Sequence, residues 1–326
     1  MTGYYFGIDA GNSKTHALIA DGDGHVLALA GLGSGNWEGI GLDNTRAVYH
    51  EVLARALAEA GLDRAQISAA GYGLAGYDFP SDDTRLRPIV ESLELPGPYF
   101  LENDALIALR AGTTRPYGVV CIAGAGSTKA GRAPDGRVFR TWGLGGYMGD
   151  EGGGGWLCRK AFGAAAQAAK GIGPQTRLTG RLLAHYGAAD VTALIEQVAR
   201  GGDYRIDYAH LVFEAAQAAD PVAAQILLEG AHSLAAGCQA VIRALAMDDT
   251  AFELVLAGGI FQAEYALLRD ALAHEVRRVA PGVEVVRLTA PPVVGAILLA
   301  MDEHGQSTSA ALRARLVAEA QARLGE

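Results

Sequence analysis

A strand pattern that occurs twice is the feature of this sequence that most limits its possible folds. Residues 4–31 predict three strands, joined first by a glycine turn at residues 11–14 and then by an Asp-Gly hairpin turn at residues 21–24. The same order of strand, glycine turn, strand, Asp-Gly turn and strand begins again near residue 118. A duplicated unit of this kind predicts two related α/β lobes.

The segment between the two copies predicts where the lobes divide. Residues 111–116 are short and polar and end in Pro116, which suits a hinge better than a long linker. We therefore expect an N-terminal lobe at residues 1–114 and a C-terminal lobe at residues 115–305. The second lobe carries a helical insertion over about residues 155–245. A final amphipathic helix, within about residues 306–326, is expected to pack on one of the lobes, with the first as the candidate.

Length and charge narrow the possible partners. The chain has 326 residues, enough for two domains, and its 27 Lys and Arg against 36 Asp and Glu give a net charge of −9. This balance argues against a general nucleic-acid or anionic-membrane binder. It leaves open a local anion site made of backbone N–H groups. With no basic leader and no apolar run of about 20 residues, we expect a cytoplasmic protein without a membrane partner.

The cysteines and histidines predict no metal centre of their own. Cys121, Cys158 and Cys238 are far apart, odd in number and without CxxC spacing. This pattern predicts reduced, mostly buried thiols in a cytosolic protein. The eight histidines show no HExxH spacing.

The first glycine turn is the first candidate for binding an anion. Two glycines and small polar residues between two strands let backbone N–H groups approach an anion closely. Asp9, at the end of a buried strand, is placed to hold Mg²⁺ beside that anion. An ordinary hairpin turn with Asp9 as a turn former is the alternative. The candidate nucleotide-binding residues here are Gly11, Asn12, Ser13, Lys14 and Thr15.

Two further glycine motifs strengthen this interpretation. Gly124, Gly126, Ser127 and Thr128 occupy the corresponding turn of the second copy and predict the other side of a polyphosphate site. Gly258 and Gly259 end a strand before a helix and leave a flat surface for an adenine or ribose, although strand-to-helix turns also need glycine for geometry alone. Neither a GxxxxGK[ST] loop nor a GxGxxG fingerprint occurs.

In order and spacing, these three motifs resemble the phosphate-1, phosphate-2 and adenosine motifs of the actin/hexokinase/Hsp70 ATPase superfamily. More closely, the chain is similar to the BadF/BadG/BcrA/BcrD ATPase family, whose best-defined enzymes are N-acetylglucosamine kinases and bacterial glucosamine kinases. The resemblance extends from Gly7 to about Ala300, and its most specific parts are residues 102–105 and 145–152. It implies two ribonuclease-H-like, actin-like ATPase domains around an inter-domain cleft, with ATP and Mg²⁺ as cofactors.

The resemblance also implies roles for individual residues. Asp104 matches the catalytic base, and its predicted place at a strand end before a helix agrees, because a carboxylate there can accept a proton from a sugar hydroxyl. A helix N-cap is the alternative role for Asp104. The other residues expected to bind the sugar with Asp104 are Asn36, Gly145, Gly146 and Asp150.

The implied activity is transfer of the ATP γ-phosphate to the 6-hydroxyl of N-acetylglucosamine or glucosamine, by a homodimer. Ala75 stands where the mammalian enzymes have serine, near the expected place of the sugar 2-substituent. Whether the substrate carries an acetylated or a free amine is therefore left open. N-acetylmuramate and glucose kinases remain alternatives. An ATPase activator of a reductase or dehydratase is disfavoured because no cysteine lies in a cluster motif. A sugar-sensing repressor is disfavoured because the first strand begins near residue 4 and leaves no room for a DNA-binding domain.

Overall fold

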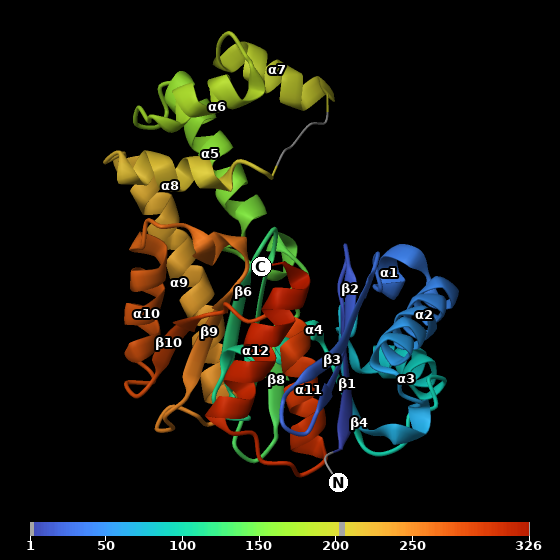
Figure 1. Cartoon of the computed structure of the whole chain (residues 1–326). Helices are drawn as coiled ribbons and strands as arrows, with labels where there is room; N and C mark the ends of the chain where they lie inside the picture. The colour runs from blue at the N-terminus through green and yellow to red at the C-terminus, as the bar shows by residue number, and fades with distance from the viewer. Residues whose placement is uncertain (1–2, 202–205, 326) are drawn as a thin grey trace. The chain divides into compact units, whose positions relative to one another are not determined.

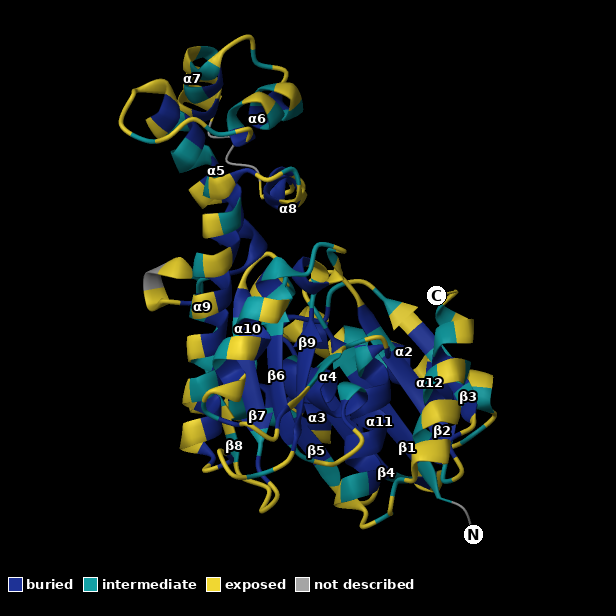
Figure 2. Ribbon diagram, turned by 90° about the vertical axis from the view of Figure 1, so that its left-hand side faces the viewer, coloured by how far each residue is buried: buried dark blue, intermediate teal, exposed yellow. Residues whose placement is uncertain are grey.

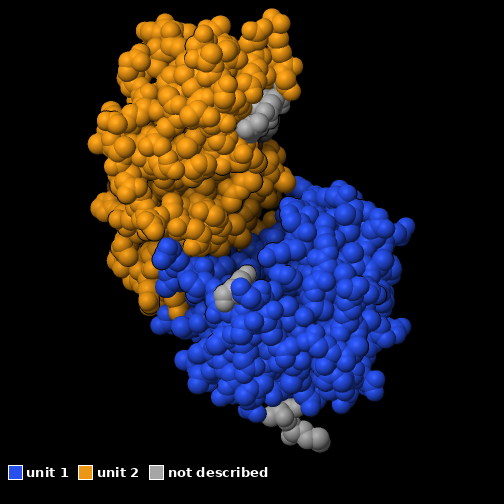
Figure 3. Space-filling model, turned by 45° about the horizontal axis from the view of Figure 1, so that its top comes forward, with its two compact units in different colours: residues 1–120, 131–138, 286–326 blue, residues 121–130, 139–285 orange. Residues whose placement is uncertain are grey.

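The computed structural model describes residues 3–201 and 206–325, and the chain divides into two compact units (Figures 1 and 3). The first unit comprises Met1–Val120, Gly131–Val138 and Val286–Glu326, and the second comprises Cys121–Ala130 and Phe139–Val285. Residues 115–120, 131–138 and 286–305 thus belong to the first unit, whereas the sequence analysis placed them in the C-terminal lobe.

Each copy of the repeated pattern begins a five-stranded sheet. The first sheet has the order β3-β2-β1-β4-β5 and the second has the order β10-β9-β6-β7-β8. When each sheet is numbered from its own first strand, the two orders are identical, so the predicted duplication is present in the topology. The strands are β1 (Tyr4–Ala10), β2 (Thr15–Asp21), β3 (Val26–Leu32), β4 (Ile67–Leu74), β5 (Tyr99–Glu102), β6 (Gly118–Ala123), β7 (Ser127–Arg132), β8 (Val138–Arg140), β9 (Glu253–Ala257) and β10 (Glu284–Arg287).

In the first unit, helices cover both faces of the sheet. One face packs against α2 (Leu42–Ala60) and α3 (Asp83–Glu91), and the other packs against α11 (Pro292–Glu303) and α12 (Ala310–Leu324). β1 and β4 are therefore buried on both sides, as their almost uninterrupted apolar and small residues require (Figure 2). The C-terminal helix α12 lies beside β3 and α11 within this unit.

Helix α11 lies unusually close to its neighbours, and the sequence analysis assigned no element to it. A Cβ added at Gly71 of β4 would lie 2.0 Å from the carbonyl oxygen of Ala296. A Cβ added at Gly295 of α11 would lie 1.8 Å from the carbonyl oxygen of Ile107, in α4 (Asp104–Gly112). Backbone contact of this kind is possible only where a residue lacks a side chain, so these glycines set the distances among α11, β4 and α4.

The predicted helical insertion of the second unit consists of five helices, with α10 following β9 (Figure 1). Helix α9 is the longest of them and packs against α5, α8 and α10. The helices of the insertion are α5 (Gly154–Ala169), α6 (Leu178–Tyr186), α7 (Val191–Gly201), α8 (Ala209–Gln217) and α9 (Pro221–Ala244), and the helix after β9 is α10 (Leu267–Arg277). The short helices of the chain are α1 (Trp37–Ile40), η1 (Arg64–Gln66), η2 (Pro80–Asp82), η3 (Gly146–Met148) and η4 (Gly259–Gln262).

The burial of the cysteines and the apolar character of the helices bear on two expectations from the sequence. Cys121, Cys158 and Cys238 are all buried free thiols, as predicted. In the described part of the chain, no helix combines the length and the apolar character that crossing a lipid bilayer demands.

Candidate active site

The parallel strands of the first unit bring their carboxyl ends to one edge of the sheet. β1 pairs in parallel with β4 and places Asp9 opposite Gly73, and β4 pairs in parallel with β5 and places Gly73 opposite Glu102. Asp104 follows β5 by two residues. Parallel pairing therefore brings Asp9 and Asp104, which are far apart in the sequence, to the same edge, where ligands of open α/β sheets commonly bind.

Asn103, and not Asp104, caps helix α4. The Asn103 side chain accepts a hydrogen bond from the Ala105 N–H at 3.0 Å, and its amide donates to the Asp78 carboxylate at 3.1 Å. Asp104 is the first residue of the helix and is partly exposed. The alternative that Asp104 serves as the N-cap is thus wrong, because its neighbour performs that role. Sequence reasoning missed Asn103, although an Asn after a strand and before a helix is an ordinary capping signal.

Asp9 is electrostatically coupled to Asp104. The pKa of the Asp9 carboxyl is raised to about 7, first by burial and second by the negative charge of Asp104, while the Lys14 ammonium partly opposes both effects. Two carboxylates that share a partly desolvated edge repel each other, and a cation between or beside them relieves the repulsion. The pair therefore has the chemistry of a site for a hard cation, or of one metal ligand and one base.

The first glycine turn is accessible except at its last residue. The Gly11 N–H donates to the Lys14 carbonyl at 2.9 Å, and this bond closes the turn. Asn12, Ser13 and Lys14 are exposed. Thr15 is buried, and its hydroxyl donates to the Gly33 carbonyl at 2.9 Å. The structure thus places the Thr15 hydroxyl inside the fold, where it fixes the neighbouring loop.

Asn36 lies in that neighbouring loop and connects it to the first turn. It caps α1 by accepting from the Glu38 N–H at 3.0 Å, and its amide donates to the Asn12 side-chain oxygen at 2.5 Å. The following Trp37 donates its indole N–H to the Gly76 carbonyl at 2.8 Å. Buried Asn36 is therefore placed beside the first turn, and in this structure its amide bonds to the chain itself. Sequence reasoning missed Gly76 as the third part of this network.

The second glycine turn is held by the beginning of helix α5. The Gly154 N–H donates to the Gly124 carbonyl at 2.7 Å, and the Gly155 N–H donates to the Ala125 carbonyl at 2.9 Å. A Cβ added at Gly124 or Gly126 would meet no atom within 4 Å, so one side of this turn is open. A Cβ added at Gly153 would lie 2.5 Å from the Gly126 carbonyl oxygen. Sequence reasoning missed this supporting contact.

The hydroxyl residues after the second turn face different surroundings. Ser127 is buried and donates to the Glu151 carbonyl at 2.8 Å. Thr128 is partly buried, and its hydroxyl lies beside Gly143, where an added Cβ would come within 1.8 Å of it. Both residues thus tie the turn to the loop that begins near residue 141.

The third motif lies directly against the second turn. Gly258 has a φ of 96°, and a Cβ added there would lie 2.4 Å from the Ala123 carbonyl oxygen. Gly259 begins η4, and a Cβ at this position would meet nothing within 4 Å. Gly258 is needed for the close approach of the two backbones. Gly259 lines open space, so it is the residue of the pair that a ligand could reach.

The predicted sugar-binding glycines lie in a loop that Asp150 folds. The Asp150 carboxylate accepts from the Leu144 N–H at 2.8 Å, and the Asp150 N–H donates to the Gly145 carbonyl at 3.2 Å. Gly145 has a φ of 86°, whereas Gly146 is exposed. The structure thus shows Asp150 as a buried residue that shapes this loop. The predicted residues divide between the units, with Asp9, residues 11–15, Asn36 and Asp104 in the first and the remainder in the second.

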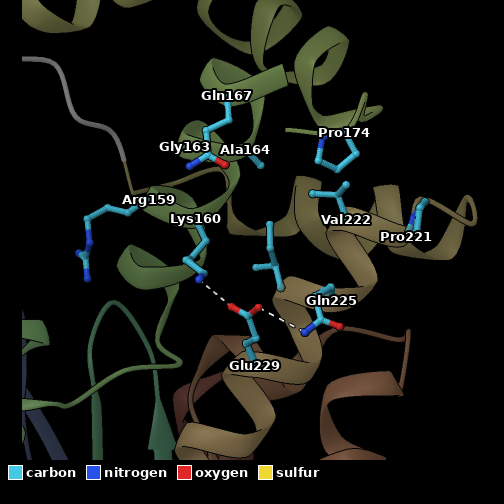
Figure 4. Close-up of a pocket in the computed structure, with 11 residues that line it drawn as sticks. Arg159, Lys160, Gly163, Ala164, Gln167, Pro174, Pro221, Val222, Gln225 and Glu229 are labelled. Atoms are coloured by element: carbon cyan, nitrogen blue, oxygen red, sulfur yellow. Dashed lines mark hydrogen bonds and ion pairs between the residues drawn. The ribbon is translucent and has the colours of Figure 1, made fainter. Parts of the chain in front are cut away.

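A cavity of about 460 Å³ in the second unit is separate from all these residues (Figure 4). It lies between α5 and α9, and its wall includes Gly163, Ala164, Pro174 and Val222. Lys160 and Glu229 form an ion pair of 2.6 Å at its edge. None of the predicted site residues lines this cavity, so the candidate site rests on the strand ends and turns.

Comparison of the fold with solved structures defines the class of protein. A Chromobacterium violaceum protein proposed to be an N-acetylglucosamine kinase matches with a TM-score of 0.65 and 26% identity, covering 91% of this chain and 98% of that one. A ROK hexokinase from Thermus thermophilus matches with a TM-score of 0.59 and 23% identity, covering 92% and 98%. The chain therefore has the two-domain fold of the ROK and actin-like ATPases, as the sequence predicted.

Sequence comparison places the chain more narrowly. Residues 6–300 match the BadF/BadG/BcrA/BcrD ATPase family, and the chain belongs to that family. An N-acetylmuramic acid/N-acetylglucosamine kinase from Clostridium acetobutylicum is 31% identical over 303 residues, which cover 92% of this chain and 99% of the relative. An N-acetyl-D-glucosamine kinase from Dictyostelium discoideum is 28% identical over 312 residues, covering 91% and 98%.

Proposed function

We propose that this protein is an ATP-dependent amino-sugar kinase that phosphorylates the 6-hydroxyl of N-acetylglucosamine or glucosamine. The observation that carries the proposal is the carboxylate pair at the sheet edge, where Asp104 helps to raise the pKa of Asp9. Family membership and the names of two relatives that match over nearly the whole chain support the sugar class.

Asp104 is proposed as the general base. Its carboxylate lies at the first position of α4, at the sheet edge and next to the capping residue Asn103, and a carboxylate at such a place can accept the proton of a sugar hydroxyl. Phosphoryl transfer depends mainly on positioning and on neutralising charge, and a base that orients the nucleophile completes the requirement. The close packing of α4 against α11 at Gly295 holds this carboxylate at a defined position.

Asp9 is proposed to hold Mg²⁺. Mg²⁺ prefers one or two carboxylates together with water and phosphate oxygens. The described residues fit this preference, because they offer the Asp9–Asp104 pair and contain no cluster of three or more His, Cys, Asp and Glu side chains that could enclose a metal. A magnesium nucleotide, when bound, supplies the phosphoryl group.

The glycine turns are proposed to bind the nucleotide. The exposed first turn offers Asn12, Ser13 and Lys14, and the second turn offers an open backbone at Gly124 and Gly126. Gly259, which lines open space beside the second turn, is proposed to contact the adenosine. Asn36, Gly145, Gly146 and Asp150 are proposed to bind the sugar.

N-acetylmuramate is the second candidate substrate, because the Clostridium acetobutylicum relative is named for both sugars. The cysteines disfavour an iron–sulfur ATPase activator, since all three are buried in β6, α5 and α9 and none is exposed where two subunits could share a cluster.

A coupled assay for ADP release tests the proposal. Glucosamine, N-acetylglucosamine, N-acetylmuramate and glucose are compared at equal concentration with ATP and Mg²⁺, and the reaction without sugar measures uncoupled hydrolysis. We expect one of the first two sugars to accelerate ADP release most, and its 6-deoxy analogue to bind without being phosphorylated. If no sugar accelerates ADP release, the kinase proposal fails. If N-acetylmuramate or glucose is preferred, only the sugar assignment changes.

A further inference from the structure

Lys129 is a buried lysine beneath the second glycine turn, and the sequence analysis gave it no role. Its side chain is 2% exposed. Lys129 and Ser127 point to the same face of β7, because side chains alternate along a strand. The Lys129 Nζ donates to the Ser127 hydroxyl at 3.0 Å, and this hydroxyl in turn donates to the Glu151 carbonyl. The ammonium group is therefore one hydrogen bond away from the turn itself.

The fold makes room for this lysine. A Cβ added at Gly237 of α9 would lie 2.7 Å from the Lys129 Cδ and 2.9 Å from its Cε. The aliphatic part of the lysine thus passes directly over a glycine on the helix. Any larger residue at position 237 would have to displace the lysine.

The ammonium has no carboxylate partner among residues 3–201 and 206–325. Within these ranges, the Nζ of Lys129 makes one hydrogen bond, to the Ser127 hydroxyl. The Cys238 thiol lies nearby but brings no negative charge, since its hydrogen bond with Cys121 and its burial raise the pKa of Cys238 well above its usual value. The N-terminus of α5, the positive end of a helix dipole, also meets this turn. A buried charge in such surroundings is unfavourable unless an anion approaches it.

We propose that Lys129 is a positioning residue for the nucleotide polyphosphate, whose negative charge it attracts from beneath the second glycine turn. This inference rests on the proposed nucleotide site and deepens it. Lys129 holds Ser127 and supplies a fixed positive charge, while the open backbone of Gly124 and Gly126 makes the direct contacts. The free protein tolerates an uncompensated ammonium, and the bound polyphosphate neutralises it.

An experiment can distinguish a role in polyphosphate binding from a purely structural role, because the two roles predict opposite effects of replacing Lys129 on the thermal stability of the free protein. If Lys129 mainly supports the fold, its replacement lowers both thermal stability and all ligand binding. If it serves a polyphosphate, an apolar side chain of similar length stabilises the free protein, because a buried unpaired charge is removed. Binding of phosphate-rich ligands then falls while binding of adenosine is unchanged.

The test uses Lys129→Met and Lys129→Gln in the full chain. Calorimetric titration with ADP, adenosine and inorganic pyrophosphate, all with Mg²⁺, is combined with thermal unfolding of the free protein. We expect Lys129→Met to weaken ADP and pyrophosphate binding about tenfold or more, as an electrostatic contact over several ångströms in a partly desolvated site predicts. Adenosine affinity is expected to stay within about twofold of the wild type, and the Tm of the free protein is expected to rise.

Lys129→Gln keeps a hydrogen-bond donor near Ser127 without the charge, so it should behave like Lys129→Met. Lys170→Met, at an exposed lysine at the other end of α5, is the control and should change none of these values. The proposal is overturned if Lys129→Met leaves the ADP affinity intact, weakens adenosine equally, or lowers the Tm. It is also overturned if Lys129→Gln binds ADP as tightly as the wild type does. A wild type that binds no ADP would instead contradict the proposed nucleotide site.

Discussion

The two glycine turns occupy equivalent places in the duplicated units, but their surroundings differ. Each turn closes on itself, the first through Gly11 and Lys14 and the second through Gly124 and Gly126, but the lysine of the first turn is exposed. The second is held by the first N–H groups of α5, and the lysine near it is buried. Asp9 precedes the first turn by two residues and is coupled to another carboxylate, whereas the buried Lys129 lacks a carboxylate partner in the described ranges 3–201 and 206–325.

This difference indicates a division of labour between the copies. The first copy gathers negative charge at its sheet edge, which suits a metal ion and a base. The second copy gathers positive potential beneath its turn, which suits a polyphosphate. Three experiments test this contrast.

The largest effect is expected at the carboxylate side. Asp104→Asn removes the proposed base but keeps the size of the side chain and the Asn103 cap. We expect sugar affinity to change little and kcat to fall about 10²–10⁴-fold, the usual contribution of general base catalysis. Steady-state kinetics and direct sugar titration measure the two quantities. Asp43→Asn, at an exposed position in α2, is the control. Near-normal turnover in Asp104→Asn would remove this residue from the base role.

A smaller effect is expected where α5 supports the second turn. In Gly153→Ala the new Cβ would lie 2.5 Å from the Gly126 carbonyl oxygen, so the turn or the helix must move. We expect a loss of about 1–3 kcal/mol in the free energy of unfolding, measured in urea, together with weaker ADP binding. Gly163→Ala in the same helix meets nothing within 4 Å and should be neutral or slightly stabilising. Equal behaviour of the two variants would show that the contact with Gly126 is unimportant.

The smallest of the three effects is expected in the pH dependence of the free energy of unfolding. The pKa of Asp9 is raised to about 7 in the folded protein, from 3.8, so the folded state binds more protons than the unfolded state between these values. The free energy of unfolding should therefore fall as pH rises from about 4 to about 7 and level off above it. We expect a contribution of about 2 kcal/mol or less, because the residue retains some contact with solvent.

Asp9→Asn should reduce this slope, whereas Asp23→Asn, in the exposed β2–β3 turn, should keep it. Urea unfolding of the metal-free protein at pH 5 and pH 8 provides the comparison. A slope that is unchanged in Asp9→Asn would contradict the raised pKa of Asp9.

Much of the fold could be predicted from local patterns. The three strands predicted within residues 4–31 are β1, β2 and β3, and the second copy begins with β6 at Gly118, because apolar runs between glycine turns define short buried strands. Helix α11 could not be predicted in this way. Nine of its twelve residues are buried, so it has no polar face to produce a helical period, and it begins at the second of two consecutive prolines. Its place in the first unit depends on close contact with Gly71 and with α4.

The sequence alone determined the duplication, the positions of the three glycine motifs, the family and the candidate carboxylates, since each of these is written in residues that lie close together along the chain. Only the tertiary structure decided that Asp9 and Asp104 interact and that Lys129 is buried beside Gly237. Parallel strand pairing and helix packing bring together residues 95 to 108 positions apart, and the local sequence pattern carries no record of those encounters.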